Sequence, residues 1–232
     1  FAVQQHNQNG FRENVYRNLN NTNRRDELFT RVKLNWSISP IVKLQIVSLN
    51  ANLNNGYDAW ATDNNKEFIT QTDEQGMDLQ QSDANSVKIH FKDFSDTDAF
   101  YQYTTSTNLL EHSYDGDWAN NDYWREDPFN FNPESTFWEY TFYEKTIRNR
   151  NQETHEIRLS SDKYSSLSWI VGYYQSQMNE SDDASGWLFG GDATSISTNF
   201  DVNNTAIYAQ FSLKISNHLS TILSIRTEDN FT

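Results

Sequence analysis

Apolar and polar residues alternate strictly on both sides of one short polar break, and this pattern is the feature that most constrains the fold of this chain. In the stretch 203–229, one face of the first arm carries Thr205, Ile207, Ala209, Phe211, Leu213 and Ile215. The other face carries Ala206, Tyr208, Gln210, Ser212, Lys214 and Ser216. After Asn217 and His218 the pattern restarts in Leu219, Thr221, Leu223 and Ile225, with only Ile222 out of place. A period of two predicts strands, so the stretch is a β-hairpin with one apolar and one polar side. A soluble sandwich and a membrane barrel can both use such a hairpin.

The same alternation recurs along the rest of the chain. It predicts strands over the ranges 1–8, 26–36, 41–50, 86–94, 99–113, 153–160 and 169–175, of which the first is the weakest. Short breaks at 37–40, 95–98 and 161–166 separate some of these strands, and Pro40 suits such a turn because it has no N–H to donate. Long polar connections at about 10–24, 54–78, 114–150 and 182–201 separate the others. Long and short connections therefore alternate.

This alternation of connection lengths points to a particular architecture. In an up-and-down sheet, alternate connections lie at the same end, so one end carries long loops and the other carries tight turns. Bacterial outer-membrane barrels have this form, whereas a jelly roll or a propeller has less reason to segregate its loops. The sequence predicts an all-β fold, a partial up-and-down antiparallel transmembrane β-barrel of about nine strands taken from a larger barrel.

Composition removes several other classes of protein. The chain has 232 residues and a net charge of −14, which disfavours binding to nucleic acid phosphates. Its aromatic content of 15% is too high for a disordered chain. It has no cysteine, so it has neither disulfides nor thiolate metal ligands. It lacks the ~20-residue apolar run of a membrane helix, which does not exclude a barrel strand of about 10 residues.

The two ends of the sequence suggest an excerpt of a longer protein. Phe1 is preceded by neither Met nor a signal peptide, and the chain stops at Thr232, just after a strand-like segment. We therefore expect further segments on both sides.

Several segments, in this order, resemble the barrel portion of TonB-dependent outer-membrane receptors. They are Asn55-Gly56-Tyr57-Asp58-Ala59, Tyr114-Asp115-Gly116-Asp117-Trp118, Arg148-Asn149-Arg150 with His155-Glu156-Ile157-Arg158-Leu159-Ser160-Ser161, Trp169-Ile170-Val171-Gly172-Tyr173-Tyr174, Ala206-Ile207-Tyr208-Ala209-Gln210-Phe211 and Leu223-Ser224-Ile225-Arg226-Thr227-Glu228. The resemblance covers most of the chain and rests on order and spacing, because barrel strands are degenerate. The final segment departs from the more usual Arg-Tyr-Glu.

The resemblance implies a monomeric barrel of about 22 strands, filled by an N-terminal plug domain. Residues 1–232 would then be an incomplete barrel domain without the plug and without the C-terminal strands. Such a receptor binds a scarce extracellular nutrient, of the siderophore, cobalamin, haem or glycan type. It admits the nutrient when the TonB complex pulls on the plug. The expected location is the bacterial outer membrane, and the expected partners are the nutrient, membrane lipid, the protein's own plug and TonB.

The sequence gives no support for catalysis. No pair of carboxylates is marked by an apolar pocket that would raise the pKa of one of them for acid catalysis. The five histidines, His6, His90, His112, His155 and His218, show no spacing typical of metal ligands. Nucleophile and phosphate-binding motifs are also missing. We therefore expect a protein that is not an enzyme and has no cofactor, apart from a weak candidate for structural calcium.

That candidate lies in the longest connection. Asp115, Asp117, Asn120 and Asp122 supply the hard oxygen atoms that calcium prefers. They depart from an EF-hand loop at Ala119 and lack its distal Glu, so a solvated loop is the competing interpretation. Any calcium bound here would stiffen the loop rather than take part in chemistry.

Five tryptophans in the predicted loops are candidates for ligand binding. They are Trp60, Trp118, Trp124, Trp138 and Trp187. Their rings could stack on a sugar or on the aromatic part of a chelated ligand, while Asn and Asp side chains supply hydrogen bonds. The competing interpretation is that they anchor the loops to one another or form the aromatic girdle of a membrane protein.

Two other functions stay open at this point. A secreted or surface carbohydrate-binding β-domain could use the same aromatic loops, and a passive porin could use the same barrel. The faces of the strands separate the first of these from the receptor. In a barrel, Leu213 and Leu223 face lipid, and Lys33, Lys88, Lys92, Arg158 and Lys214 face the lumen. In a soluble domain the apolar face packs against a second sheet.

Overall fold

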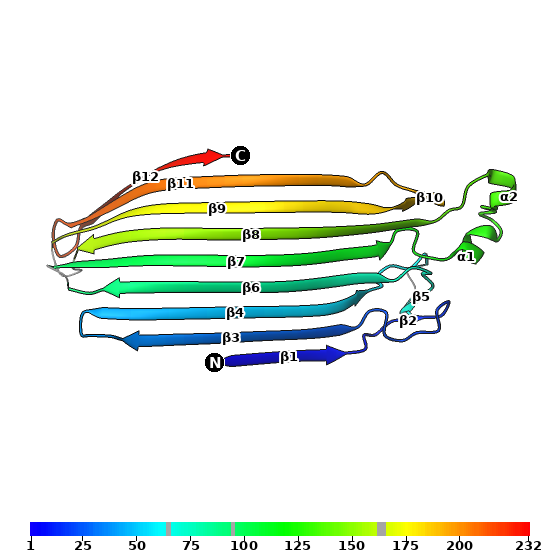
Figure 1. Cartoon of the computed structure of the whole chain (residues 1–232), viewed down its shortest axis with the longest axis horizontal. Coiled ribbons are helices and arrows are strands. Elements are labelled where there is room, and N and C mark those ends of the chain that lie inside the picture. The colour runs from blue at the N-terminus through cyan, green and yellow to red at the C-terminus, as the bar shows by residue number, and fades with distance from the viewer. Residues whose placement is uncertain (64–65, 94–95, 162–165) are drawn as a thin grey trace.

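A single large antiparallel sheet dominates the computed structural model, which describes residues 1–63, 66–93, 96–161 and 166–232. The strands of this sheet are β1 (Ala2–Gln8), β3 (Arg25–Ser37), β4 (Val42–Tyr57), β6 (Gly76–Phe91), β7 (Thr97–Asp115), β8 (Phe142–Ser161), β9 (Leu167–Leu188), β11 (Ile196–Lys214) and β12 (Ser220–Phe231). They lie side by side in chain order, with the two-residue strand β10 (Gly191–Asp192) paired to β9 (Figure 1). The predicted up-and-down antiparallel architecture is confirmed. The sheet does not close on itself.

The two ends of the sheet differ, as the connection lengths predict. The short turns after β3 and β11 lie at one end, on the left of Figure 1, where β6 and β8 also end and β7 and β9 begin. The predicted breaks 95–98 and 161–166 fall partly outside the described residues. At the opposite end lie β2 (Glu13–Asn14), β5 (Ile69–Thr70), α1 (Asn121–Arg125) and α2 (Pro133–Thr136). β2 and β5 form a separate parallel pair. In the described part of the chain, no helix is both long and apolar enough to cross a membrane.

The largest errors in the predicted strand boundaries lie at the long-loop end, whereas those at the short-turn end are at most three residues. β4 continues to Tyr57, β6 begins at Gly76, β8 begins at Phe142 and β9 continues to Leu188. Segments within the predicted loops 54–78, 114–150 and 182–201 are therefore strand. The physical reason is that both faces of these extensions are polar. Backbone pairing continues there, but the alternation that marks a strand in the sequence has stopped.

Cross-strand register lines up the apolar residues into rows. One row consists of Trp36, Leu44, Ile89, Tyr101, Ile157, Tyr173 and Ile207, each directly opposite the next. A second row consists of Val42, Phe91, Ala99, Leu159, Val171, Ala209 and Ile225. We call these two rows the apolar belt. It crosses the sheet next to the short turns, and its members are largely exposed, as Trp36 at 55% and Ile225 at 67% illustrate.

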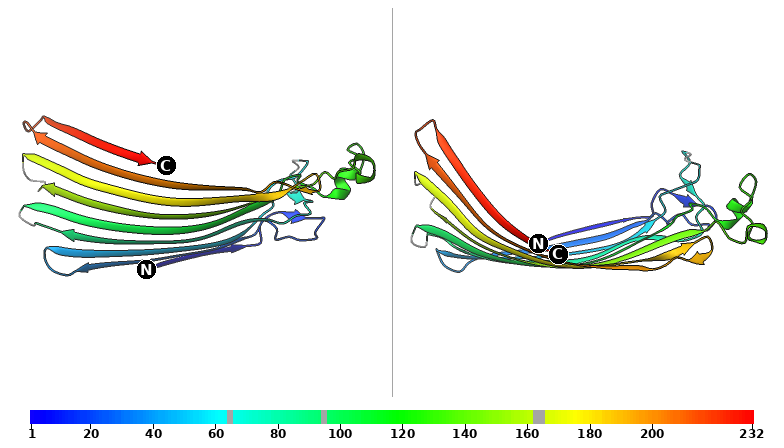
Figure 2. Two further views of the ribbon diagram at one scale, coloured as in Figure 1. Left: turned by 45° about the horizontal axis from the view of Figure 1, so that its top comes forward. Right: turned by 90° about the horizontal axis from the view of Figure 1, so that it is seen from above.

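The opposite face of the sheet is the more buried one. Between the two belt rows, on that other face, runs the row Lys43, His90, Phe100, Arg158, Gly172, Tyr208 and Arg226. The buried residues of the strands near the belt, Ala51, Phe100, Gly172 and Ala206, all lie on this face. The sheet is curved, as Figure 2 shows, and a curved sheet crowds the side chains of its concave side. We therefore call this polar face the inner face and the belt-bearing face the outer face.

Tight contacts on the inner face fix the positions of its largest side chains. The Tyr208 ring lies directly over Gly172, where an added Cβ would come within 2.1 Å of the ring. Its hydroxyl donates a hydrogen bond of 2.5 Å to Glu156. The ammonium group of Lys88 and the guanidinium group of Arg158 lie 3.8 Å and 4.4 Å from the centre of the Phe100 ring. These are cation–π distances.

Candidate ligand-binding surface

The first long loops are held together by one buried carboxylate at the end of β4. Asp58 accepts hydrogen bonds from the hydroxyls of Thr22 and Thr70, both at 2.6 Å, and of Thr72 at 3.2 Å. It also accepts one of 3.3 Å from the side chain of Asn14. All five residues are at least nine-tenths buried. Because Asn14 belongs to β2 and Thr70 to β5, this carboxylate ties the small parallel pair to the end of the large sheet.

An aromatic strip lies beside this network, at the long-loop end of the inner face. Trp60 and Trp118 stack with their ring centres 5.8 Å apart, and the Trp60 indole N–H donates to the Tyr57 hydroxyl at 3.3 Å. The Tyr57 ring packs edge-on against His112 at 4.7 Å, and His112 lies 5.8 Å from Tyr114. Strand register places the last three residues on the inner face. We call these five residues the aromatic strip.

The strip is accessible and has polar groups along its edge. Trp60 and Trp118 are 53% and 42% exposed, which leaves ring surface open to a ligand. Asp78 lies 3.8 Å from His112 and also 3.8 Å from Arg25, while the Tyr114 hydroxyl donates to Glu144 at 2.9 Å. Burial and the neighbouring Glu144 raise the pKa of Tyr114. Flat aromatic surface bordered by hydrogen-bonding groups suits a ligand with both apolar and polar faces.

Buried carboxylates set the position of Trp118. Asp115 accepts from the backbone N–H groups of Asp117 and Trp118, at 3.2 Å and 2.9 Å. Asp117 accepts from the N–H groups of Ala119 and Phe142 and from the indole of Trp124 at 2.9 Å. These bonds hold Trp118 at a left-handed φ of 66°. Burial and the charge of Asp117 raise the pKa of Asp115 to about 8.

The calcium candidate gains no support from this geometry. The oxygens of Asp115 and Asp117 already accept hydrogen bonds, and the Asn120 side chain caps α1 by accepting from the Tyr123 N–H. Asp122 is exposed in the first turn of α1. The described residues contain no group of three or more His, Cys, Asp or Glu side chains placed to hold a metal ion. The calcium site therefore stays a prediction from the sequence.

The connection between β7 and β8 folds into a compact cap that contains two of the predicted tryptophans. Trp124 packs against Tyr140 at 4.4 Å and Phe129 at 4.9 Å, and Trp138 packs against Phe131 at 5.2 Å and Phe189 at 5.0 Å. These rings meet mainly one another. Trp124 and Trp138 therefore act as anchors of the loop in this structure.

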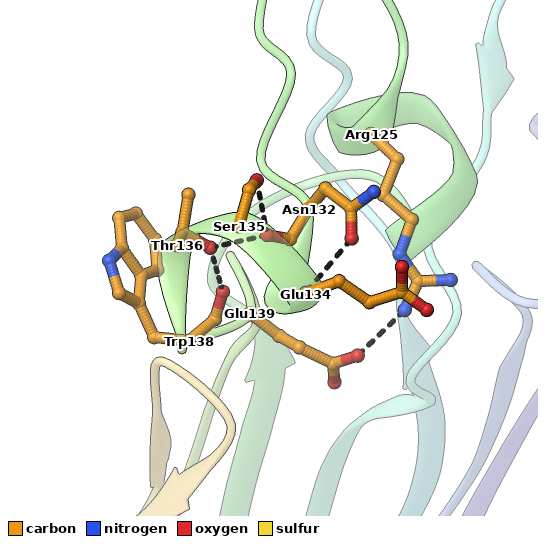
Figure 3. Close-up of polar contacts among 7 residues, drawn as sticks. All are labelled: Arg125, Asn132, Glu134, Ser135, Thr136, Trp138 and Glu139. Atoms are coloured by element: carbon orange, nitrogen blue, oxygen red, sulfur yellow. Dashed lines mark hydrogen bonds and ion pairs between the residues drawn. The ribbon is translucent and has the colours of Figure 1, made fainter.

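Polar contacts around α2 complete the cap (Figure 3). The Asn132 side chain accepts from the Glu134 N–H at 3.0 Å, and the Thr136 hydroxyl lies 2.7 Å from the carbonyl oxygens of both Asn132 and Trp138. An ion pair of 2.7 Å between Arg125 and Glu139 joins the end of α1 to the segment after α2. A short helix with a side-chain cap and an ion pair orders a loop that would otherwise carry many unpaired backbone groups.

The prediction that Trp187 lies in a loop was wrong. It belongs to β9, where it stacks on Tyr143 of β8 with ring centres 4.5 Å apart and donates to the Thr141 hydroxyl at 3.3 Å. Among the five candidates, the structure brings Trp60 and Trp118 together in the accessible strip and Trp124 and Trp138 together in the cap. The strip residues Tyr57, His112 and Tyr114 were not predicted. In the sequence, Tyr57 and Tyr114 each come directly before an aspartate at a strand end, which could have drawn attention to them. The strand register is what brings these two tyrosines and His112 together.

Two histidines of the sheet, His90 and His155, have structural partners. The Tyr101 hydroxyl lies 2.8 Å from Nδ1 of His155, and His90 lies 3.6 Å from Asp98. The prediction that the chain is not an enzyme stays a prediction.

Comparison with known proteins gives one informative result. No protein-family model and no curated protein sequence matches the chain. Among solved structures, the crystal structure of the ferric yersiniabactin uptake receptor FyuA from Yersinia pestis superposes with a TM-score of 0.70 at 8% sequence identity. The superposition covers 99% of this chain and 37% of that chain, so the present chain spans little more than a third of that receptor's length. At this identity the likeness establishes the fold alone, an up-and-down antiparallel sheet that superposes on part of that receptor's structure.

Proposed function

We propose that this chain is part of the β-barrel of an outer-membrane receptor that takes up a scarce nutrient with energy supplied through TonB. The observation that carries the proposal is the inverted distribution of side chains. The apolar belt is on the exposed outer face, and Lys43, Lys88 and Arg158 are at the same level on the concave inner face. Such an arrangement suits a wall with lipid outside and a polar lumen inside. A sandwich would bury the belt against a second sheet.

Three further observations support the receptor over other barrels. The short turns lie next to the belt, and the strands extend far beyond it at the opposite end, as in outer-membrane barrels with long extracellular loops. The aromatic strip lies at that end and offers an accessible surface to an extracellular ligand. The structural neighbour is itself an uptake receptor. The ligand, the membrane lipid, a plug domain and the TonB complex would be the partners.

Cysteine labelling tests the topology directly, because the chain has no cysteine of its own. Single variants Trp60→Cys and Ser216→Cys place a thiol at the long-loop end and in the turn between β11 and β12. In cells producing the full-length protein, a membrane-impermeant maleimide should label the first variant on intact cells. It should label the second only after the outer membrane is permeabilised. Equal labelling of both in a soluble fraction would instead support a secreted carbohydrate-binding domain.

Energy coupling requires a separate experiment. In the source bacterium, deletion of this gene and deletion of the tonB gene should produce a shared growth defect on at least one limiting iron, cobalamin, haem or glycan source. A passive porin would give a defect that does not depend on TonB. The absence of any shared defect across that panel would refute energised uptake while leaving the barrel intact.

A further inference from the structure

The outer face of the sheet changes from apolar to polar along one line beyond the apolar belt. On three neighbouring strands, the last apolar or aromatic residue of this face and the polar residue next to it are Ile46 and Ser48, Val87 and Asn85, and Tyr103 and Thr105. The strand register places Ile46, Val87 and Tyr103 directly opposite one another, so the change occurs at the same level on all three strands.

Three outer-face rows beyond this line form a surface that we call the amide panel. The rows begin at Ser48, Asn50 and Asn52 on β4 and end at Asn203, Asp201 and Asn199 on β11, with each residue directly opposite the next. Of the eighteen residues in these rows, ten are asparagine or glutamine, three are aspartate or glutamate, and none is basic or aromatic. The panel therefore offers many amide donors and acceptors but no cation that would hold a phosphate.

A hollow of about 290 Å³ lies in this panel across β8, β9 and β11. Its lining residues from the panel are Asn149, Asn151, Asn179, Ser181, Asn199 and Asp201. Glu180 also contributes to the lining, but by register its side chain lies on the inner face, where it pairs with Arg148 and Arg150. The one panel carboxylate in the hollow, that of Asp201, accepts a hydrogen bond from the side chain of Asn179.

The remaining amides of the hollow are available to a ligand. Asn149, Asn151 and Asn199 are exposed, and in the described part of the chain their side chains make no hydrogen bond. Sugar hydroxyls both donate and accept hydrogen bonds, and a side-chain amide can match them in both roles. The volume of the hollow is close to the lower limit for small-molecule sites, about 300 Å³. The hollow therefore suits a single sugar unit.

The level of the hollow indicates the source of such a sugar. In β8, Asn151 and Asn149 lie six and eight residues beyond Ile157 of the belt, a height of roughly 15–20 Å at about 3.3 Å per residue and a tilt of about 40°. Under the proposed function the belt contacts lipid. The hollow is continuous with the belt on the same face, so it then faces the head groups of the surrounding lipid on the long-loop side.

We propose that the hollow of the amide panel binds a neutral sugar in the head group of a membrane glycolipid beside the barrel. This inference rests on the proposed function, which places the belt in lipid. The amides of Asn149, Asn151 and Asn199 contact the sugar hydroxyls, while the three panel carboxylates repel phosphate. The lipid tail contacts the belt at the same time, so the two contacts are linked and the sugar contact alone need not be strong.

Native mass spectrometry of the full-length protein in detergent measures this binding. The probes are glycolipid extracted from the outer membrane of the source bacterium, the glycan released from it by mild acid, and the lipid that remains. The double variant Asn149→Ala, Asn151→Ala should weaken binding of the intact glycolipid at least about tenfold, or 1.4 kcal/mol. It should leave binding of the remaining lipid unchanged, because the belt is intact.

The matched control is the double variant Asn52→Ala, Gln81→Ala. It removes two exposed amides from the same panel, on β4 and β6, outside the hollow. Its binding of the glycolipid should stay within about twofold of that of the unmodified protein, a difference of under 0.5 kcal/mol. Heat-modifiable mobility in gels verifies that each variant is folded.

The outcomes distinguish the parts of the proposal. Equal weakening by both double variants, or by neither, would overturn the hollow as the sugar site. A released glycan that binds as tightly as the intact glycolipid would overturn the membrane source of the sugar. Loss of glycolipid binding at about 0.5 M salt would indicate contact with phosphate and would overturn the neutral sugar as ligand.

Failure of the proposed function gives a different result. Cysteine labelling that finds the protein in a soluble fraction would overturn the proposed function and, with it, the glycolipid as ligand. A protein that is correctly inserted in the outer membrane, but whose glycolipid binding does not depend on Asn149 and Asn151, would overturn the sugar site alone.

Discussion

Replacing Asp58 with alanine should loosen the β2–β5 pair while leaving the large sheet intact. In the structure, Thr22 and Thr70 each donate a 2.6 Å hydrogen bond to this carboxylate, and Asn14 and Thr72 add longer ones. A hydrogen bond to a charged group contributes about 1.5–3 kcal/mol, and a buried polar group left unpaired costs about 1–3 kcal/mol. Asn14 retains its hydrogen bond to the Thr72 carbonyl at 2.9 Å, so its side chain is not left unpaired and the free-energy cost of the substitution is smaller.

The two short bonds therefore set the scale, at about 3–5 kcal/mol for local opening. Because each 1.4 kcal/mol is tenfold, the opening equilibrium should shift by a factor of roughly 10² to 4 × 10³. Hydrogen exchange measures this at the amides of Asn14 and Val15, which donate to the carbonyls of Leu19 and Thr70. Asp83→Ala is the matched control, because within the described part of the chain that exposed carboxylate accepts a single hydrogen bond, from Asn50 at 2.9 Å.

Exchange at Asn14 and Val15 that changes less than about threefold in Asp58→Ala would refute this reasoning, since the network would then contribute under 1 kcal/mol. Equal effects in Asp58→Ala and Asp83→Ala would refute it too, because they would point to a general loss of negative charge.

Three further perturbations have defined outcomes. Gly172→Val should displace the Tyr208 ring and break its bond to Glu156, at a cost of about 1–3 kcal/mol that appears as a lower unfolding temperature of the heat-modifiable band. The pKa of Asp115 is raised from 3.8 to about 8, so between these pH values the folded loop binds a proton that the unfolded loop has lost. The stability of the folded loop should therefore fall as pH rises from about 4 to 8. Tryptophan fluorescence can follow this trend, and Asp115→Asn should remove it. Calcium should leave that fluorescence and the unfolding temperature unchanged, and a rise that Asp117→Asn abolishes would restore the calcium site.

The fold was predictable where one side of the strand meets an apolar environment. In β11 the alternation of Ile207, Phe211 and Leu213 with polar residues marks the strand, and register confirms that these residues share the outer face. In β8 the alternation of apolar and polar residues fails before residue 153. There Asn149 and Asn151 lie on one face of the strand, and charged residues lie on the other face. Neither face is apolar there, so sequence reasoning placed loop where the backbone forms strand.

The candidate site was predictable only in part, because tryptophan content does not tell packing from exposure. Trp60 and Trp118 lie in the accessible strip, whereas Trp124 and Trp138 pack within the cap. The difference arises from long-range partners such as Tyr140, whose position depends on how the loop folds. The strand register that brings Tyr57, His112 and Tyr114 together likewise could not be predicted from the sequence.

The length of the strands beyond the apolar belt separates two events in space. In β8, the fifteen residues 142–156 lie between the belt and the long-loop end, which at about 3.3 Å per residue and a tilt of about 40° is a height of roughly 40 Å. A nutrient that stops on the aromatic strip would still have that distance to travel before it reaches the level of Lys88 and Arg158. Under the proposed function, capture and transit are kinetically distinct steps. Changes to Trp60 should then alter how strongly a nutrient is held, and changes to Lys88 or Arg158 should alter how fast it passes the belt.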